Sequence, residues 1–353
     1  MQIEARESVA LWQVVLAPLA AVLMALALCS LLIVWTGSSV GAAYLALWQG
    51  GVGSRFALTE TLTRATPLIL TGLAVAVAFR AKLWNIGAEG QFYAGALAAT
   101  LLGSGAITAP AWLLIPLLLA AGAGAGGLLL GIPAWLKVRF RVDEVVTTLL
   151  LNFIVLLAVS YLLEGPLKDP LALGWPQARP IMATGVLPKL MERTRLHGGL
   201  LLALAAAGLI WGINRLTIWG YEMKAVGSNP EAAAFLGIPV HRVILYTSLL
   251  SGGLAGLAGV SEVTGLKGYL TLDLSPGFGY SGIVVAMLAQ QHPLGVVAAA
   301  VFIAGIYVGA DSMSRSLGVP TYLADVIVAT ALLGMLVSSW LTHYRIRWEK
   351  KRD

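Results

Sequence analysis

The stretch GYEMKAVGSNPEAAAFLGIP, residues 220–239, is the clearest polar island in a chain that is otherwise mostly apolar. Asn229 can cap the free N–H groups of a helix start, Pro230 suits the first helical position, and Glu231 complements the positive end of the helix dipole. Three alanines then favour helix, Gly237 suits the C-terminal cap, and Pro239 prevents continuation. The pattern predicts a helix of about two turns, roughly 10 Å long. So short a helix is marginal alone in water and should dock on another surface.

The composition outside this island is that of a polytopic all-α membrane protein. The chain has 353 residues, of which 58% are hydrophobic and only 11% are charged, whereas soluble domains carry about 25% charged residues. The net charge of +6 would suggest nucleic acid as a partner of a soluble protein, but here the cations gather at the ends of apolar segments. We therefore expect a lipid bilayer, and no nucleic acid, as the surroundings of this chain.

Cysteine and histidine usage predicts neither a metal nor another cofactor. Cys29 is the single cysteine and lies in an apolar run, which excludes an intrachain disulfide. The histidines are scattered without the spacing of metal ligands: His197, His241, His292 and His343.

The apolar segments predict about ten membrane-spanning helices, at residues 14–35, 66–79, 85–102, 111–132, 145–163, 198–213, 243–263, 277–289, 294–310 and 322–341. The eighth of these is short enough to be either a span or a re-entrant segment. Glycines spaced by four in the fourth and seventh segments predict close helix–helix contacts. Residues 164–197 are proline-rich and polar, so we expect this loop outside the membrane.

Ten spans place both termini on one side of the membrane. Assigning that side to the cytoplasm puts 14 of the 23 lysines and arginines there, as the positive-inside rule favours. These include the basic tail with Arg345, Arg347, Lys350, Lys351 and Arg352. The same orientation places the predicted short helix in the cytoplasm.

The first cluster of polar residues inside an apolar segment is Asn85, Glu89 and Gln91. A helix that starts within the membrane exposes N–H groups that can face a polar solute. One interpretation is that these three side chains line a solute pathway. The other is that they lie at the water interface, where Glu89 complements the helix dipole.

The second cluster is Glu144, Thr148 and Asn152, which share one helical face at four-residue spacing. Asn152 and Thr148 either face a water-filled path or hydrogen-bond to neighbouring helices. We interpret Asp143 and Glu144 as a helix start at the cytoplasmic surface. Glu262 and Asp311 lie near the predicted outer ends of spans, where exposure at the interface is expected. Ser281, Gln290 and Gln291 flank the short eighth segment and become pathway candidates if that segment is re-entrant.

No sequence motif supports catalysis. The chain lacks the G-x-x-x-x-G-K-[ST] phosphate loop, so it cannot hydrolyse a nucleotide by that route. It also lacks H-E-x-x-H and G-x-S-x-G. We therefore expect a transport subunit rather than an enzyme.

Four segments, taken together, resemble a known family. They are KLWNIGAEGQFYAGALAA (82–99), DEVVTTLLLNFI (143–154), AVGSNPEAAAFLGI (225–238) and SGIVVAMLAQQHPLGVVAAAVF (281–302). Their order is similar to that in ABC-transporter permeases of the simple-sugar, ribose and branched-chain amino-acid group, and within it to the nucleoside-type branch. The resemblance covers about residues 66–341.

The resemblance implies a single permease domain over 1–353 in the bacterial inner membrane, with a cytoplasmic start (1–13), a coupling loop (215–242) and a basic tail (342–353). It implies three partners: an ATPase, a second permease subunit, related or identical, and a periplasmic or lipoprotein solute-binding protein. It also implies that the short helix couples to the ATPase through Asn229, Glu231, Ala232, Ala233, Gly237 and Ile238.

Two other classes compete with this interpretation. A secondary transporter or channel without an ATPase would need several paired charges deep in its spans, and this chain has few. A membrane scaffold or enzyme would need a catalytic cluster, and the sequence shows none. Within the importer class, the mostly neutral pathway candidates favour a nucleoside over a sugar or an amino acid. The exact solute stays open, as does the choice between two identical and two different permease subunits.

Overall fold

The computed structural model describes residues 2–5 and 11–347, which are helical apart from a short two-stranded ribbon and the connecting loops. In the ribbon, β1 (Gln2–Ala5) pairs antiparallel with β2 (Tyr344–Arg347). Arg6 and the tail residues Lys350, Lys351 and Arg352, which the orientation argument counted, lie outside the described residues.

The chain divides into two compact units. The first unit contains the residues up to Leu58 and those from Gly305 onward. Its helices are α1 (Leu11–Trp35), α2 (Val40–Val52), the later part of α12 (Pro293–Leu317), and α13 (Leu323–His343). Helices α1 and α13 pack along each other, and the backbone of α2 meets that of α12 where a side chain at Gly51 would collide with the carbonyl of Gly305.

The second unit, from Thr59 to Ala304, holds the remaining helices and the features that the sequence singled out. In chain order they are most of α3 (Arg55–Arg80), α4 (Ala88–Gly103), α5 (Ala111–Phe140), α6 (Glu144–Glu164), the 3-10 turn η1 (Ala183–Gly185), α7 (Gly199–Leu216), α8 (Ile218–Ser228), α9 (Pro230–Phe235), α10 (Val240–Glu262), the π-helical turn η2 (Val263–Lys267), α11 (Phe278–Leu288) and the start of α12.

The helices confirm the predicted all-α membrane class. Six of the described helices are long and apolar enough to cross a membrane, and the pair α1 and α2, bent by 117°, makes a seventh if it counts as one span. Together with the apolar helices α4, α11 and α13, the candidate helices number about ten.

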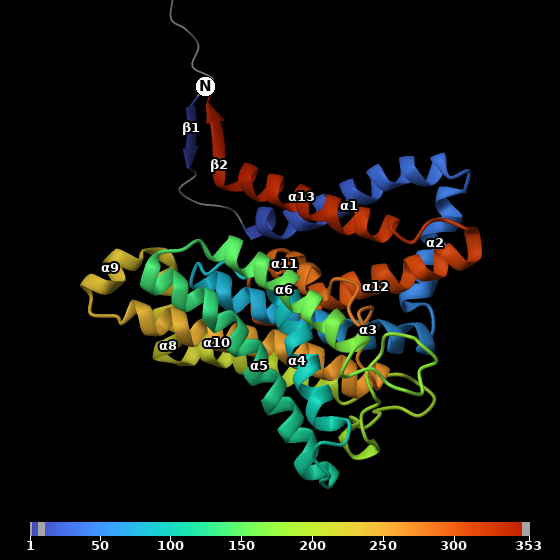
Figure 1. Ribbon diagram of the computed structural model, residues 1–353. Coiled ribbons are helices and arrows are strands. Elements are labelled where there is room, and N and C mark those ends of the chain that lie inside the picture. Colours follow the sequence, from blue (N-terminus) through green and yellow to red (C-terminus); the bar gives the residue numbers. More distant parts are fainter. Residues whose placement is uncertain (1, 6–10, 348–353) are drawn as a thin grey trace, which may run out of the picture. The chain divides into compact units, whose positions relative to one another are not determined.

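Helix α10 lies at the centre of the second unit, packed against α5 and α4 (Figure 1). The predicted close contact between glycine faces is confirmed. A side chain at Gly126 would collide with the carbonyl oxygen of Gly252, and one at Gly256 would collide with that of Gly122. These glycines let the backbones of α5 and α10 approach closely, and lipid offers no hydrophobic effect that could replace such packing.

The helices extend beyond the predicted spans where they carry polar residues. Helix α3 begins at Arg55, well before the predicted residue 66, and α5 continues to Phe140. Helix α8 lies in the polar island, where only the shorter helix after it was predicted. Hydropathy finds the part of a helix that lipid surrounds, so it misses turns that continue into water or against other protein.

The proline-rich loop and α9 lie at opposite ends of the second unit. The loop joins the start of α7 at Gly199, whereas α8 and α9 follow the other end of α7, roughly 27 Å away (Figure 1). As predicted, residues 165–198 form no α-helix and contain only the short turn η1. We call the two ends of this unit the loop end and the α9 end.

Candidate functional site

The local signals for α9 are confirmed at both of its ends. The side chain of Asn229 accepts hydrogen bonds from the backbone N–H groups of Glu231 and Ala232, each at 3.0 Å, and Pro230 is the first helical residue. Gly237 has φ of +83°, a left-handed conformation that glycine adopts without strain. The N–H of Ile238 then reaches the carbonyl of Ala233 at 3.0 Å, so the helix is closed by backbone hydrogen bonds.

The C-terminal end of α9 exposes large apolar side chains, which the sequence argument missed. Phe235 is 93% exposed and the neighbouring Leu236 is 73% exposed, while Ala233 on the inner side is buried. These two large apolar side chains have no cover within the described part of the chain. The helical pattern alone could have shown them, because they follow the three alanines directly.

Helix α8 connects α9 to the end of α3. Gly227 of α8 lies so close to the backbone of Arg80 that a side chain there would collide with the Arg80 carbonyl oxygen. The Arg80 guanidinium in turn points at the carbonyl of Gly220, at 3.4 Å, and Lys82 Nζ lies 3.5 Å from the carbonyl of Ser228. The loop that leads from α3 to α4 therefore begins in contact with α8.

Asn85 and Gln91, two of the three residues of the first cluster, pair with each other. The Asn85 amide donates to Gln91 Oε1 at 2.9 Å, and the Gln91 amide donates back to Asn85 Oδ1 at 2.8 Å. Asn85 also donates to Ser251 Oγ of α10 at 3.0 Å, and that hydroxyl donates to the Ala74 carbonyl of α3 at 2.7 Å. All these side chains are buried, so the non-helical loop between α3 and α4 is held inside the bundle by amides.

Asn152 of the second cluster joins the same network from α6. Its Oδ1 accepts from the N–H of Gly90 at 2.7 Å, and its amide donates to the Ile86 carbonyl at 3.0 Å and lies 3.3 Å from the Tyr280 hydroxyl. Thr148, one turn earlier, is also buried and bonds to the Glu144 carbonyl of its own helix at 2.7 Å. The shared face of α6 thus points into the bundle, and Asn152 bonds between helices.

Glu89 caps a second helix that also starts inside the bundle. Its Oε2 accepts from the N–H of Gly279 at 2.7 Å, in the first turn of α11. The preceding Gly277 has φ of +92°, and residues 268–277 are not helical. With 11 residues, α11 covers only about 16 Å, which is too short to cross a bilayer by itself, and the residues that lead to it form turns and bends.

The predicted helix start at Asp143 and Glu144 is confirmed, whereas the expected surface position of Glu144 is not. Asp143 caps α6 by accepting from the N–H of Val145 at 2.7 Å. Glu144, however, is buried: it forms an ion pair with Lys137 of α5 and accepts from the backbone N–H of Trp84 at 3.3 Å. It therefore connects α6 to α5 and to the loop between α3 and α4, and does not face water.

The expected interfacial exposure of Glu262 is wrong. The residue is 2% exposed, and its Oε1 has no hydrogen-bond partner within the described part of the chain. Arg64, Arg195 and Lys267 surround it with positive charge. These cations come from three separate segments of the chain, so hydropathy along the sequence cannot reveal the environment of this residue.

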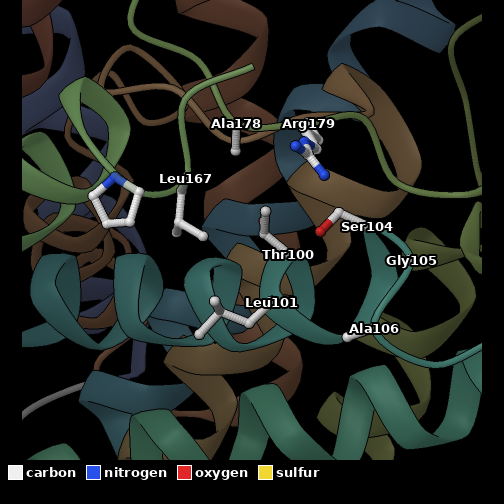
Figure 2. A pocket seen from close by; sticks show the side chains of 9 residues that line it. Thr100, Leu101, Ser104, Gly105, Ala106, Leu167, Ala178 and Arg179 are labelled. Atoms are coloured by element: carbon white, nitrogen blue, oxygen red, sulfur yellow. The ribbon is translucent and has the colours of Figure 1, made fainter. Parts of the chain in front are cut away.

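A pocket of about 460 Å³ opens at the loop end (Figure 2). It lies between the C-terminal turn of α4, with Thr100 and Ser104, and the proline-rich loop, with Leu167 and Arg179. None of the predicted site residues lines it. Among the described residues, no three histidine, cysteine, aspartate or glutamate side chains gather in a way that could hold a metal ion.

Comparison with known proteins assigns the family. Residues 57–336 match the family model described as branched-chain amino acid transport system / permease component. The chain belongs to this permease family. It is therefore a multi-pass membrane protein and the permease component of a transport system.

Three relatives illustrate the similarity. The glucose ABC transporter permease protein TsgB13 of Haloferax volcanii is 36% identical over 98% of this chain and 93% of its own length. The guanosine ABC transporter permease protein NupP of Bacillus subtilis is 38% identical over 96% of this chain and 97% of its own. A second guanosine permease of the same organism, NupQ, is 28% identical over 69% of this chain and 77% of its own.

For a permease of this family, the geometry divides the predicted residues into two groups. Asn85, Glu89, Gln91 and Asn152 come together around the two helix starts inside the bundle. The predicted coupling residues lie apart from them, on α9 and in the turn that follows it. They are joined to the network through α8 and the end of α3, and through α10, which carries Ser251. Ser251 and Gly279 complete the network, and the sequence argument missed both because neither stands out from its apolar surroundings.

Proposed function

We propose that this chain is the membrane-spanning permease subunit of an ATP-driven importer for nucleosides. The observation that carries the solute class is the 38% identity to the guanosine permease NupP over nearly the full length of both chains. The network around the two helix starts is built mainly of neutral amides and hydroxyls, which suits an uncharged polar solute. A simple sugar is the second candidate, because TsgB13, a glucose permease, is almost equally similar.

In this proposal the chain hydrolyses no nucleotide and α9 docks on a separate ATPase subunit. Phe235 and Leu236 supply the exposed apolar contact, and the caps at Asn229 and Gly237 keep the helix rigid. Because α8 lies against the end of α3, a push on α9 reaches the loop that carries Asn85. ATP-driven motion would thus be delivered to the buried network.

The importer would contain two permease subunits that differ in sequence. Bacillus subtilis has two permeases named for guanosine, NupP and NupQ, which resemble this chain to different degrees. Two such chains side by side would form the pore, and this chain would take the place that NupP takes. A solute-binding protein or lipoprotein would deliver the nucleoside.

The proposed orientation follows from the distribution of positive charge. Both termini and α9 lie on the cytoplasmic side of a bacterial inner membrane, and the loop end faces outward. The binding protein would then meet the proline-rich loop, and the ATPase would meet α9.

The solute would cross next to the network formed by Asn85, Glu89, Gln91, Thr148 and Asn152. Two helices that start inside the bundle support this choice, since broken helices with free N–H groups are typical solute sites of transporters. In the conformation described, Asn85 and Gln91 bond to each other, and Asn152 and Glu89 bond to backbone groups near the two helix starts. The pathway would therefore open when the loop between α3 and α4 moves.

Reconstitution tests the proposal. The chain is purified with its ATPase, second permease and solute-binding protein, and placed in liposomes with ATP. We expect ATP-dependent accumulation of radiolabelled guanosine and background uptake of glucose. Accumulation of glucose alone would favour the second candidate, whereas uptake that proceeds at the same rate without ATP would refute the importer itself.

A further inference from the structure

Residues 168–178 of the proline-rich loop form a compact projection, which we call the finger. Its base is closed by an antiparallel bridge between Lys168 and Ala178 and by a hydrogen bond of 2.9 Å from Asp169 N–H to the Gln177 carbonyl. The Asp169 carboxylate accepts from the Leu171 N–H at 3.0 Å, which fixes the turn from inside. The finger is therefore an ordered structure rather than a loose connection.

The tip of the finger presents three large apolar side chains to solvent. Leu173 is 101% exposed, Leu171 is 87% exposed and Trp175 is 65% exposed. Leu173 also has φ of +49°, and Gly174 follows with φ of +93°. A left-handed leucine costs about 1 kcal/mol or more, and such strain is typical of functional sites. The chain thus sustains both backbone strain and exposed apolar surface at the same tip.

The finger is attached by backbone hydrogen bonds to residues 268–271, which belong to the non-helical stretch that leads to α11. Ala178 N–H donates to the Leu270 carbonyl at 3.0 Å, Ile181 N–H to Gly268 at 2.8 Å, and Gln177 pairs with Thr271. Residues 268–277 then run into the bundle and end at the helix start that Glu89 caps. A force on the finger would therefore be transmitted to the buried network without crossing any other helix.

Positive charge flanks the base of the finger. Lys168 forms the bridge with Ala178, and Arg179 follows it directly. The loop as a whole, residues 165–198, contains five cations against two anions. An apolar centre with aromatic character inside a charged rim is the usual anatomy of a protein–protein contact. A lipid surface adapts to any shape and would not require a strained, preformed turn.

We propose that the finger is the contact through which the importer's solute-binding protein docks, inserting Leu171, Leu173 and Trp175 into an apolar socket rimmed by acidic side chains. This inference rests on the proposed function, which supplies the partner, and adds the surface that receives it. Docking there would couple delivery of the solute directly to the segment that precedes α11.

Photocrosslinking tests the contact. Benzoylphenylalanine is placed at residue 173 in the assembled transporter in lipid nanodiscs, and the purified solute-binding protein is added. The matched control carries the same probe at Trp112, an exposed apolar residue in the first turn of α5 at the same end of the unit. We expect an adduct with the binding protein from residue 173 and none from residue 112. An adduct of residue 173 with lipid alone, or with no partner, would overturn the proposal.

A functional measurement supports the crosslink independently. Leu173→Ser should lower the stimulation of ATP hydrolysis by the binding protein at least tenfold and leave the basal rate unchanged, and Leu173→Met should restore the stimulation. Leu190→Ser, at an exposed leucine of the same loop outside the finger, should behave as the wild type. Equal stimulation in Leu173→Ser and wild type refutes the docking role. A wild-type complex that transports no solute with ATP refutes the proposed function instead, and the crosslink still reports on the finger.

Discussion

At the level of single residues, Asn152 shows why an amide lies within an apolar helix. Both of its polar atoms bond to backbone groups of the loop between α3 and α4 and of the first turn of α4, and the side chain is fully buried. The asparagine side chain carries an NH₂ donor and a carbonyl acceptor next to each other, which no other side chain of similar size does. The position of this loop inside the bundle therefore depends on the identity of one residue on another helix.

We predict that Asn152→Ala destabilises the protein, because it leaves the Gly90 N–H and the Ile86 carbonyl without partners. Each unsatisfied buried group costs about 1–3 kcal/mol. The thermal midpoint in detergent measures this loss, with Thr147→Ala, a half-buried residue near the start of the same helix, as the control. Normal stability combined with slower guanosine uptake would instead favour direct contact between Asn152 and the solute.

We predict that acid lowers the stability of the loop end, because His197 is buried there. The ring is fully buried in the space left by Gly199 and Gly265, and burial lowers its pKa from 6.5 to about 4. Above pH 6.5 the residue is neutral in both the folded and the unfolded protein, so its titration does not reduce the free energy of unfolding. As the pH falls from 6.5 toward 4, only the unfolded loop binds the proton, so stability decreases by up to about 3 kcal/mol.

Hydrogen exchange of residues 177–198 measures this effect. We expect faster exchange at pH 5 than at pH 7.5 in the wild type, and a weaker pH dependence in His197→Phe, which cannot titrate. The ion pair between Arg195 and Glu60 should keep the rest of the attachment in place over this range. Equal protection at both pH values would contradict the prediction.

At the level of elements, α9 depends on its caps. Gly237→Val forces a β-branched residue into a left-handed conformation and should change the path from α9 to α10. We expect membrane insertion to stay normal while guanosine uptake is lost. Gly208→Val, at an open surface of α7, is the control. Wild-type uptake by Gly237→Val, with normal ATP consumption, would show that α9 is not a lever.

The contact between α5 and α10 offers a matched pair of glycines on one helix. Gly126 lies against the backbone of α10, whereas Gly124 faces open space. Gly126→Val should lower the thermal midpoint markedly because the two helix backbones must separate, while Gly124→Val should leave it unchanged. Both variants make the same substitution in the same helix. A similar drop of the thermal midpoint in both would therefore indicate an effect of helix propensity rather than of packing.

At the level of the whole molecule, the proposed function depends on which side of the membrane α9 and the finger face. In a Cys29→Ala background, a cysteine replacing Glu231 on α9 should react with a membrane-impermeant maleimide only from the cytoplasmic side. A cysteine replacing Leu173 should react only from outside, because the two residues lie at opposite ends of the second unit. Labelling of both positions from one side would refute the proposed topology.

The sequence predicted what depends on neighbours along the chain. Composition established the all-α membrane class, the order of apolar segments gave about ten helices, and Asn229 with Gly237 marked the ends of α9. It also predicted that Glu144, Thr148 and Asn152 share a face, because helical periodicity is a local property. The family resemblance to permeases was confirmed for the same reason: its motifs are contiguous.

Only the tertiary structure decided which polar residues have partners, and where. Glu89 meets Gly279, which lies 190 positions later in the chain, and Glu262 is buried among cations from three segments although its position suggested exposure. The finger rests on residues about 90 positions away. The energy of burying a polar or charged group is set by the partners that folding brings to it, and no local pattern encodes them.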